Sequence, residues 1–255
     1  MSLLEMDNAT MQFGGLKCVD GLTFSLGDHE LVGLIGPNGA GKTTVFNMVT
    51  GVYPPTAGRV TFQGTHVSGQ RPYKITGRGI ARTFQNIRLF GSLSVFDNVR
   101  TACNMHLKHG ISHAIFRGRG YLAEERQIHA NVMELLEMFG LAEFHDRPGN
   151  SLPYGDQRRL EIVRALATRP KLLLLDEPAA GMNPSEKENL MQLIRFTQEK
   201  FGLSILLVEH DMKVVMGICE RIIVLDYGRK IAEGGPREIR SNPAVIAAYL
   251  GKEAE

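Results

Sequence analysis

A glycine-rich stretch that ends in lysine and threonine carries the clearest chemistry of this 255-residue chain. Residues 36–44 read Gly-Pro-Asn-Gly-Ala-Gly-Lys-Thr-Thr, the phosphate-loop pattern of two glycines separated by four residues and followed by Lys and Thr. Glycines let the backbone turn sharply and bring consecutive N–H groups against an anion. Lys42 would reach the β- and γ-phosphates of a nucleotide, and the Thr43 hydroxyl would ligate Mg²⁺. A turn that binds no ligand would give no reason for the Gly-Lys-Thr ending, so the pattern predicts a nucleoside triphosphate site.

Two carboxylates follow a run of four leucines at residues 172–175. Such a run is typical of a fully buried strand, which would deliver Asp176 and Glu177 at its carboxyl end. Asp176 is placed to hold Mg²⁺ through the water shell of the ion. Glu177 could orient and polarise a water molecule for attack on the γ-phosphate. A solvated acidic turn would explain the pair alone, but the phosphate loop favours the chemical interpretation.

His210 and Gln85 also follow expected strands. In a parallel sheet, His210 would lie on the same edge as Lys42 and Glu177, where it could hydrogen-bond the γ-phosphate or hold the attacking water. The Gln85 amide can accept from water and ligate Mg²⁺. Gln85 also stands where a helical block begins, so it could report the nucleotide state to that block. Without the shared sheet edge, neither residue would indicate a function.

Residues 151–160 bring a glycine to the start of a helix. The N–H groups and the dipole at a helix N-terminus form a second potential phosphate site, centred on Gly155. One chain can hardly use this helix and the phosphate loop on the same γ-phosphate. A dimer could, if each subunit offered the Gly155 helix to the nucleotide of its partner.

Strands that alternate with helices must position these residues. We expect antiparallel strands in residues 3–30 with turns at 13–15 and 27–28, and an inserted helical block from about 94 to 149 with a mobile loop at 108–120. Further strands are expected at 30–35, 59–64, 79–85, 171–176, 204–208 and 222–225. Helices are expected at 43–49, 121–139, 155–168, from the N-cap Asn183, from Asp211 to 216, at 236–240 and at 243–250. The pattern predicts an α/β P-loop NTPase with a mostly parallel sheet covered on both faces, an N-terminal antiparallel β subdomain and an inserted helical subdomain.

Composition places the chain among ordinary globular proteins. Hydrophobic residues make up 43% and charged residues 22%. The net charge of +2 gives no support for nucleic-acid binding. No apolar run approaches the roughly 18 residues of a membrane span, and no secretory signal stands at the start. The three cysteines Cys18, Cys103 and Cys219 are far apart, which favours reduced thiols in a cytosolic protein.

The order of these motifs resembles the ABC transporter ATPase family over nearly the whole chain. The resemblance implies that Phe13 stacks on adenine, for which core packing is the alternative. Residues 152–156 occupy the five-residue signature of the family, with Pro153 in place of Ser, Tyr154 in place of the first Gly and Asp156 in place of Gln. Asn183 replaces an Asp of the family, and helix capping could explain it without a role across a dimer.

Carried over by position, the resemblance implies three sets of site residues. The catalytic set is Glu177, His210 and Gln85. The metal set is Thr43, Gln85 and Asp176. The nucleotide set is Phe13, Gly36, Pro37, Asn38, Gly39, Ala40, Gly41, Lys42, Thr43, Thr44, Leu152, Tyr154, Gly155 and Asp156.

Within the family, several stretches are similar to the ATPases of branched-chain amino acid uptake systems: 13–16, 82–90, 154–162, 177–184 and 209–212. An insertion at about 107–125 resembles the larger of the two ATPases in those systems. The implied protein is an ATP-hydrolysing importer subunit that uses ATP and Mg²⁺ and lies in the cytoplasm, peripheral on the inner face of the cell membrane. Its expected partners are integral-membrane permease subunits, a second ATPase subunit (itself or the smaller paralogue) and, indirectly, a substrate-binding protein.

The division of the chain follows from the same resemblance. We expect a nucleotide-binding core with the β subdomain at 1–90 and 160–235, a helical subdomain with the signature at 91–159, and a helical tail at 236–255. The surface after Gln85, with Ile87, Leu89 and Phe90, is a candidate groove for a permease helix, and ordinary subdomain packing is its alternative.

Two other functions stay open. A soluble ABC-type ATPase that acts on ribosomes or DNA would usually carry two ATPase modules or long apolar heptads, and this chain has one module and no heptad run. An ATPase for lipid export is the alternative among transporters, and the signature and the insertion argue against it by resemblance. No residue of this chain is expected to touch the cargo.

Overall fold

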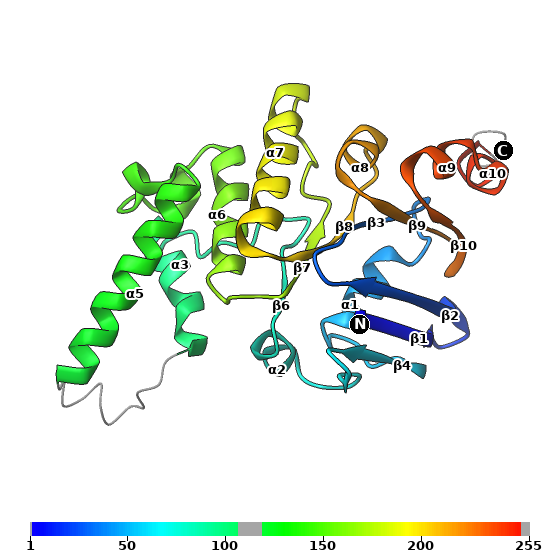
Figure 1. Cartoon of the computed structure of the whole chain (residues 1–255), viewed down its shortest axis with the longest axis horizontal. Coiled ribbons are helices and arrows are strands. Elements are labelled where there is room, and N and C mark those ends of the chain that lie inside the picture. The colour runs from blue at the N-terminus through cyan, green and yellow to red at the C-terminus, as the bar shows by residue number, and fades with distance from the viewer. Residues whose placement is uncertain (1, 107–118, 251–255) are drawn as a thin grey trace. The chain divides into compact units, whose positions relative to one another are not determined.

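The computed structural model describes residues 2–106 and 119–250, which form two compact units (Figure 1). The first unit consists of residues 1–85 and 171–255 and contains both sheets. The second unit, residues 86–170, is helical and covers a wider range than the 91–159 expected from the sequence. Residues 108–118 of the expected loop and most of the insertion at 107–125 lie outside the described residues, while residues 119 and 120 begin a helix.

A six-stranded sheet forms the centre of the first unit, in the order β10-β9-β3-β8-β7-β6. The five strands from β9 to β6 run parallel, and β10 is antiparallel to β9. Their bounds are β3 Leu31–Ile35, β6 Ile80–Arg82, β7 Leu172–Asp176, β8 Ser204–Val208, β9 Arg221–Asp226 and β10 Arg229–Gly234. Every residue of β3, β7 and β8 is buried, so both faces of the sheet are covered, as the runs of Leu, Ile and Val predict.

Helices follow the strands in the first unit, as a doubly wound topology requires. Their bounds are α1 Lys42–Val49, α2 Pro72–Gly77, α7 Pro184–Phe201, α8 Met212–Ile218, α9 Pro236–Ser241 and α10 Pro243–Leu250. Asn183 caps α7 in a full capping box with Glu186, and Asp211 caps α8. Both predicted caps are therefore confirmed. No helix of the described ranges is long and apolar enough to cross a membrane.

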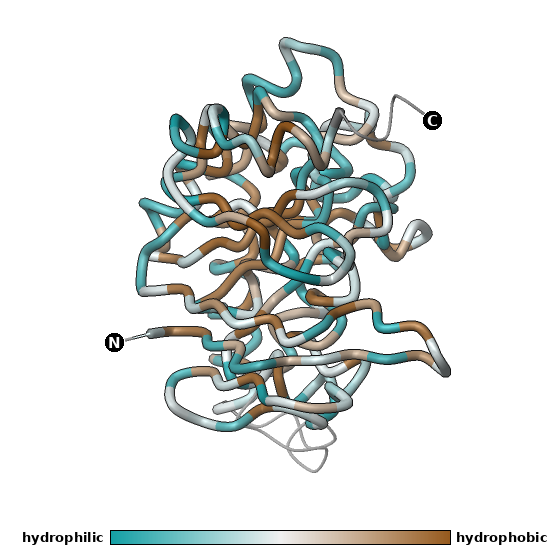
Figure 2. The backbone as a smooth tube through the Cα atoms, turned by 90° about the vertical axis from the view of Figure 1, so that its right-hand side faces the viewer, coloured by the Kyte–Doolittle hydropathy of each residue, from teal (hydrophilic) through white to brown (hydrophobic). Residues whose placement is uncertain are grey.

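The N-terminal residues form a second, antiparallel sheet in the order β2-β1-β4-β5. Its strands are β1 Ser2–Phe13, β2 Leu16–Gly27, β4 Ala57–Phe62 and β5 Thr65–His66. One hydrophobic core joins the inner face of this sheet, the apolar side of α1 and one face of the parallel sheet. Figure 2 shows that many of the most hydrophobic stretches of the backbone lie toward the interior and that hydrophilic stretches are frequent on the outer turns.

Within its described residues, 86–106 and 119–170, the helical unit contains three α-helices and short 3₁₀ turns. Its elements are α3 Val95–Cys103, η1 Asn104–His106, α5 Arg119–Met138, η2 Ala142–Phe144, η3 Gly149–Ser151 and α6 Tyr154–Leu166. Ile128, Val132 and Leu136 on α5 are buried, and their spacing of four residues places them on one face of the helix. Phe139, just after the end of α5, is buried as well.

The sequence interpretation fails at two places in the first unit. The strand expected at 79–85 pairs with β7 only from Ile80 to Arg82, and Thr83 adds one further bond to the Leu174 carbonyl. Gln85 therefore lies beyond the strand, two residues after the last hydrogen bond to β7, which Thr83 makes. Helix α2 was not predicted, since its six residues are too few to show a periodicity.

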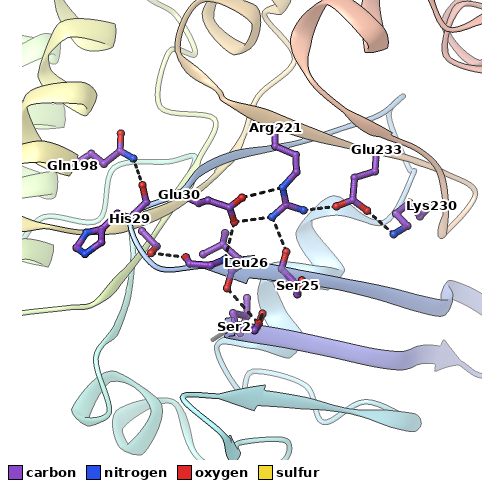
Figure 3. Close-up of polar contacts among 12 residues, drawn as sticks. Ser2, Ser25, Leu26, His29, Glu30, Gln198, Arg221, Lys230 and Glu233 are labelled. Atoms are coloured by element: carbon purple, nitrogen blue, oxygen red, sulfur yellow. Dashed lines mark hydrogen bonds and ion pairs between the residues drawn. The ribbon is translucent and has the colours of Figure 1, made fainter.

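An ion-pair network ties the antiparallel sheet to the amino ends of the parallel strands (Figure 3). Arg221 opens β9 and binds both oxygens of Glu30 at 3.1 and 2.7 Å, and it also donates to the Ser25 carbonyl on β2 at 2.8 Å. A second carboxylate, Glu233 on β10, binds Arg221 and accepts from Lys230 at 2.6 Å. Burial opposes ionisation of Glu30 and Glu233, but the hydrogen bonds from their cationic partners outweigh it and lower the pKa of both.

Replacing Arg221 with methionine should cost about 1–3 kcal/mol of stability at pH 7, because two half-buried carboxylates lose their partner. A carboxyl group with a lowered folded-state pKa stabilises the protein above its unfolded pKa, about 4.3 for glutamate, and this stabilisation is lost as the pH falls through the folded-state pKa. The difference in the free energy of unfolding between wild type and Arg221→Met should therefore be smaller at acid pH. Urea unfolding of both proteins at pH 7 and at pH 4 measures this difference.

The matched control is Arg59→Met, which removes the exposed ion pair of Arg59 with Asp7. Such surface pairs contribute about 0–1 kcal/mol, so this variant should unfold almost like wild type at both pH values. An equal loss of unfolding free energy in the two variants, independent of pH, would contradict the role given to the Arg221 network.

Candidate nucleotide site

The phosphate loop runs from the carboxyl end of β3 to the start of α1, as its sequence predicts. Lys42 is buried, and its Nζ donates to the carbonyls of Gly36 and Pro37 at 2.6 and 3.0 Å. Thr43 is exposed at the first turn of the helix. The lysine thus braces its own loop, while the threonine hydroxyl is accessible to a ligand.

Two glycines of the loop are required by close backbone contacts. Gly36 has φ +151°, and a Cβ there would stand 2.1 Å from the Leu225 carbonyl oxygen. Gly41 has φ +102°, and its Cβ would stand 2.5 Å from the Cys18 carbonyl oxygen. Both contacts are with backbone atoms, which cannot move aside as a flexible side chain would. The loop is therefore held against β9 on one side and β2 on the other.

Asp176 ends β7 in a buried ion pair that the sequence analysis missed. Its Oδ2 lies 2.7 Å from Nη2 of Arg82, and both side chains are less than a tenth exposed. Arg82 ends the neighbouring strand β6, in parallel register with Leu174. An arginine at the end of a short apolar strand was the available signal, because a buried guanidinium demands a partner.

Three of the expected catalytic side chains meet after the strands. Gln85 donates from Nε2 to Glu177 Oε2 at 2.8 Å, and His210 Nδ1 lies 3.5 Å from the same oxygen. Glu177 has φ +45°, a left-handed conformation unusual for a residue with a side chain. Its N–H donates to the Val208 carbonyl at 2.8 Å. This bond holds the turn that places the carboxylate between the glutamine and the histidine.

Glu209 is a further acidic residue that the sequence analysis did not single out. It is fully buried after β8, and its Oε1 accepts from the Ala179 N–H at 2.7 Å. Its Oε2 accepts from the N–H groups of His210 and Asp211. Burial raises the pKa of Glu209 above its ordinary value, although the N–H groups partly offset the effect. Glu209 thus joins the loop after β7 to the loop that carries His210.

Phe13 stands at the end of β1, with 42% of its surface exposed. Core packing, the alternative for this residue, is therefore wrong. The Tyr53 ring meets it edge to face, with ring centroids 5.2 Å apart and an angle of 81° between the planes. An exposed aromatic ring supported from one side can stack on a planar base.

The five-residue signature forms the start of α6 in the helical unit. Pro153 is the N-cap, and Tyr154 and Gly155 are the first helical residues. Leu152 is buried, whereas Tyr154 is 44% exposed. Among the described atoms, none outside the local chain would lie within 4 Å of a Cβ added at Gly155. The helix itself therefore gives no steric reason for a glycine.

The segment after Gln85 divides between burial and exposure. Phe90 is 53% exposed and lies under the Arg164 guanidinium at 5.5 Å, while Ile87 and Leu89 are half-buried. Burial lowers the pKa of Arg164, against the effect of Glu161. The Phe90 N–H donates to the Asn98 side chain at 2.9 Å, which anchors the segment to α3.

The oxygen donors at this edge suit a hard divalent cation such as Mg²⁺, which prefers hydroxyl, carboxylate and amide oxygens. The Thr43 hydroxyl is accessible, and Arg82 binds Asp176 through one carboxylate oxygen. No cluster of three or more His, Cys, Asp or Glu side chains with metal-ligand geometry occurs in the described part of the chain. A metal held jointly by a nucleotide and one or two protein oxygens fits this donor set better than an all-protein cage.

A phosphate loop at the end of β3 and an acidic pair at the end of β7, on one parallel sheet, define an ATP-binding P-loop enzyme. Comparisons with known proteins agree. Residues 19–180 match the family model of the ABC transporter, and residues 229–255 match that of the branched-chain amino acid ATP-binding cassette transporter. The chain belongs to the ABC transporter ATPase family, whose members couple ATP hydrolysis to transport.

Individual relatives cover almost the whole chain. The high-affinity branched-chain amino acid transport ATP-binding protein LivG of Salmonella typhimurium is 45% identical over 250 residues, 98% of each chain. The lipopolysaccharide export system ATP-binding protein LptB of Escherichia coli is 35% identical over 99% of each chain. A crystal structure of the ADP conformation of an ATP-binding cassette from an ABC transporter superposes with a TM-score of 0.85 at 29% identity, covering 98% of this chain and 99% of that one. The predicted α/β P-loop fold is thereby confirmed.

Proposed function

We propose that this chain is the ATP-hydrolysing subunit of an importer that takes up branched-chain amino acids through separate permease subunits. The observation that carries the cargo assignment is the match of residues 229–255 to the branched-chain amino acid family model, together with 45% identity to LivG. The fold alone would not support it, because one ATPase fold serves many cargoes.

The site residues take the following roles in this proposal. Phe13 stacks on adenine, and the N–H groups of residues 36–44 cradle the phosphates. Thr43, Gln85 and Asp176 hold the Mg²⁺ of the bound nucleotide. The metal would neutralise charge that develops on the phosphate oxygens. Glu177 takes a proton from the attacking water, and His210 positions that water.

Geometry around Glu177 supports this division of roles. Its carboxylate is 20% exposed, between the Gln85 amide and the His210 ring. The Gln85 amide donates to one oxygen of the carboxylate, and the His210 ring lies 3.5 Å from that oxygen. These neighbours hold the carboxylate in place, and correct placement is the first requirement of a general base. Positioning and electrostatic stabilisation then supply most of the catalysis, as in other phosphoryl transfers.

A second copy of an ATPase subunit completes the site in this proposal. The N-terminus of α6, with Leu152, Tyr154, Gly155 and Asp156, would face the γ-phosphate bound by the partner. Asp156 is paired with Arg159 at 3.0 Å, and Pro153 offers no hydroxyl, so the backbone around Gly155 remains as the donor to phosphate. The partner is either an identical chain or a smaller paralogue.

Replacing Gly155 with leucine tests this contact. The change should leave the stability of the isolated chain unchanged or slightly higher, because space is open around Gly155 and leucine favours a helix more than glycine does. Hydrolysis should fall by about 100-fold, the effect of losing donors to a developing charge. Steady-state ATPase assays and thermal unfolding separate the two effects.

Gly235→Leu is the matched control, since Gly235 has an ordinary φ of −70° and open space around its Cβ. It should retain wild-type hydrolysis. Full activity in Gly155→Leu would show that α6 does not contact the bound nucleotide.

The proposal places the chain at the cytoplasmic face of the cell membrane, docked on permease subunits. The segment Ile87–Phe90 is the surface proposed to receive a permease helix, because it follows Gln85 directly and exposes Phe90. A substrate-binding protein would then act on the transporter from the other side of the membrane, without contact with this chain. Export of a lipid is the second candidate, favoured by the 35% identity to LptB.

Co-purification separates the two candidates. The tagged chain, expressed in its native host and extracted with detergent, should recover two permeases and a smaller ATPase. In liposomes, leucine with the matching binding protein should stimulate hydrolysis by the recovered complex. Recovery of lipid-export permeases, or stimulation by lipid and not by amino acids, would overturn the cargo assignment while leaving the ATPase assignment in place.

A further inference from the structure

Arg82 occupies an unusual position for an arginine. Its side chain is 8% exposed, and its guanidinium carbon lies 5.3 Å from the ring centroid of Phe46 and 5.1 Å from that of Phe84. Nη1 donates to Asn47 Oδ1 at 2.7 Å, and Nη2 binds Asp176 Oδ2 at 2.7 Å. The planar group thus lies against two aromatic rings and forms hydrogen bonds through two of its nitrogens.

These partners belong to the elements that carry two of the proposed metal ligands, Thr43 on α1 and Asp176 on β7. Asn47 stands four residues after Thr43 on α1, so the two side chains share one face of the helix, one turn apart. Asp176 is the last residue of β7. One guanidinium therefore spans from the Thr43 face of α1 to the carboxylate at the end of the strand. Phe84, which packs on it, is the neighbour of Gln85 in the chain.

Only arginine can make this connection. Its rigid fork presents two nitrogens in fixed directions and stacks on aromatic faces, whereas lysine offers a single ammonium group. Arg82 binds one oxygen of Asp176, and this fixes the direction of the other oxygen. The buried Nε of Arg82 has no hydrogen-bond partner among the described residues. The position of the arginine is therefore not explained by satisfying all of its own hydrogen-bond donors.

We propose that Arg82 is a positioning residue that sets the spacing between Thr43 and Asp176, and through it the affinity of the site for the divalent cation of the bound nucleotide. This inference rests on the proposed ATP and Mg²⁺ site. A residue with only a structural role would change the stability of the protein and would weaken ATP binding equally with and without the metal.

The ratio of two dissociation constants tests the proposal. In the Glu177→Gln background, which prevents turnover, Kd for ATP is measured by calorimetry once with Mg²⁺ and once with EDTA. By thermodynamic linkage, the ratio reports the affinity of the protein–ATP complex for the metal relative to that of free ATP. In Arg82→Met the ratio of Kd with Mg²⁺ to Kd with EDTA should rise by about tenfold or more, the usual effect of losing a partner that orients a metal ligand.

Three further variants make the result decisive. Arg82→Lys should raise the ratio nearly as much, because it keeps the charge but loses the fork. Asn47→Ala should raise it less, because it removes one of the two ties. Arg221→Met, which removes an arginine–carboxylate connection at the opposite ends of the strands, should leave the ratio unchanged. If Arg82→Met fails to fold, Arg82→Lys and Asn47→Ala still decide the question.

An unchanged ratio in Arg82→Lys and Asn47→Ala overturns the inference, even if both variants unfold at lower temperature. Failure of the Glu177→Gln parent to bind ATP under either condition has a different meaning. It would overturn the proposed nucleotide site itself, because Arg82 is intact in that protein.

Discussion

Glu177→Gln is expected to lower the rate of ATP hydrolysis by about 10²–10⁴-fold, the usual contribution of a general base, while ATP binding is retained. The substitution exchanges one carboxylate oxygen for an amide nitrogen and keeps the size and shape of the side chain. Glutamine has no basic oxygen that can accept the proton of the attacking water. The phosphate loop and Lys42 lie on other elements, so the groups that bind the phosphates are untouched.

The surroundings of Glu177 explain why the loss should fall on the rate of the chemical step. Its Oε2 lies 2.8 Å from the Gln85 Nε2 and 3.5 Å from the His210 Nδ1. A glutamine can still hydrogen-bond to either neighbour, so the arrangement of the loops should survive. With hydrolysis blocked, two ATP molecules should hold the proposed dimer closed, and the variant should elute as a dimer when ATP and Mg²⁺ are present.

Steady-state hydrolysis, nucleotide binding and size-exclusion chromatography measure the three expected outcomes. Glu188→Gln is the matched control, because it makes the same exchange at an exposed position on α7. This control should hydrolyse ATP at the wild-type rate and should not be trapped as a dimer. Hydrolysis at the wild-type rate in Glu177→Gln would show that another group accepts the proton.

Residues that are predictable from the sequence are those whose local pattern has one physical explanation. The Gly-Lys-Thr ending, the four leucines before Asp176 and the Asn183 cap all fall where the patterns place them. Each depends on neighbours within a few positions along the chain. The order of the strands in the parallel sheet does not follow from such patterns, because β3 and β6, consecutive in this sheet along the chain, are separated in space by β8 and β7.

Contacts between segments that are distant along the chain could not be predicted from the sequence. Arg82 and Asp176 are 94 positions apart, and the local sequence of either strand does not indicate that the two residues pair. Glu209 reads as one more polar residue after a strand until the structure shows that the residue is fully buried. Tyr53 meets Phe13 only because β1 and the loop after α1 come together in space. The residues proposed to carry the chemistry could therefore be named from the sequence, while the groups that hold them in place could not.

Lys42→Met is expected to abolish measurable hydrolysis and to weaken ATP binding by about 3 kcal/mol, roughly 100-fold in Kd, because hydrogen bonds from a charged donor contribute about 1.5–3 kcal/mol each. In the structure, Lys42 Nζ donates to the Gly36 and Pro37 carbonyls at 2.6 and 3.0 Å. A bound triphosphate would offer the ammonium group stronger, negatively charged acceptors at the mouth of the same loop. Methionine keeps the length of the side chain and removes both the charge and the donors.

The same contacts predict a second, smaller effect of Lys42→Met, which separates bracing of the loop from binding of the phosphates. The buried carbonyls of Gly36 and Pro37 lose the hydrogen bonds from the lysine, although Pro37 still accepts from the Ala40 N–H at 3.1 Å. The nucleotide-free protein should therefore unfold about 1–2 kcal/mol more easily. Lys42→Arg should restore the charge but not the activity, because a planar guanidinium does not fit where a compact ammonium group lies among the carbonyls. Calorimetry with ATP and urea unfolding without it measure the two effects, with Lys200→Met, at an exposed position near the end of α7, as the control. If Lys42→Met bound ATP as tightly as wild type, the loop would hold nucleotide through its backbone alone, and Lys42 would serve only to brace the turn.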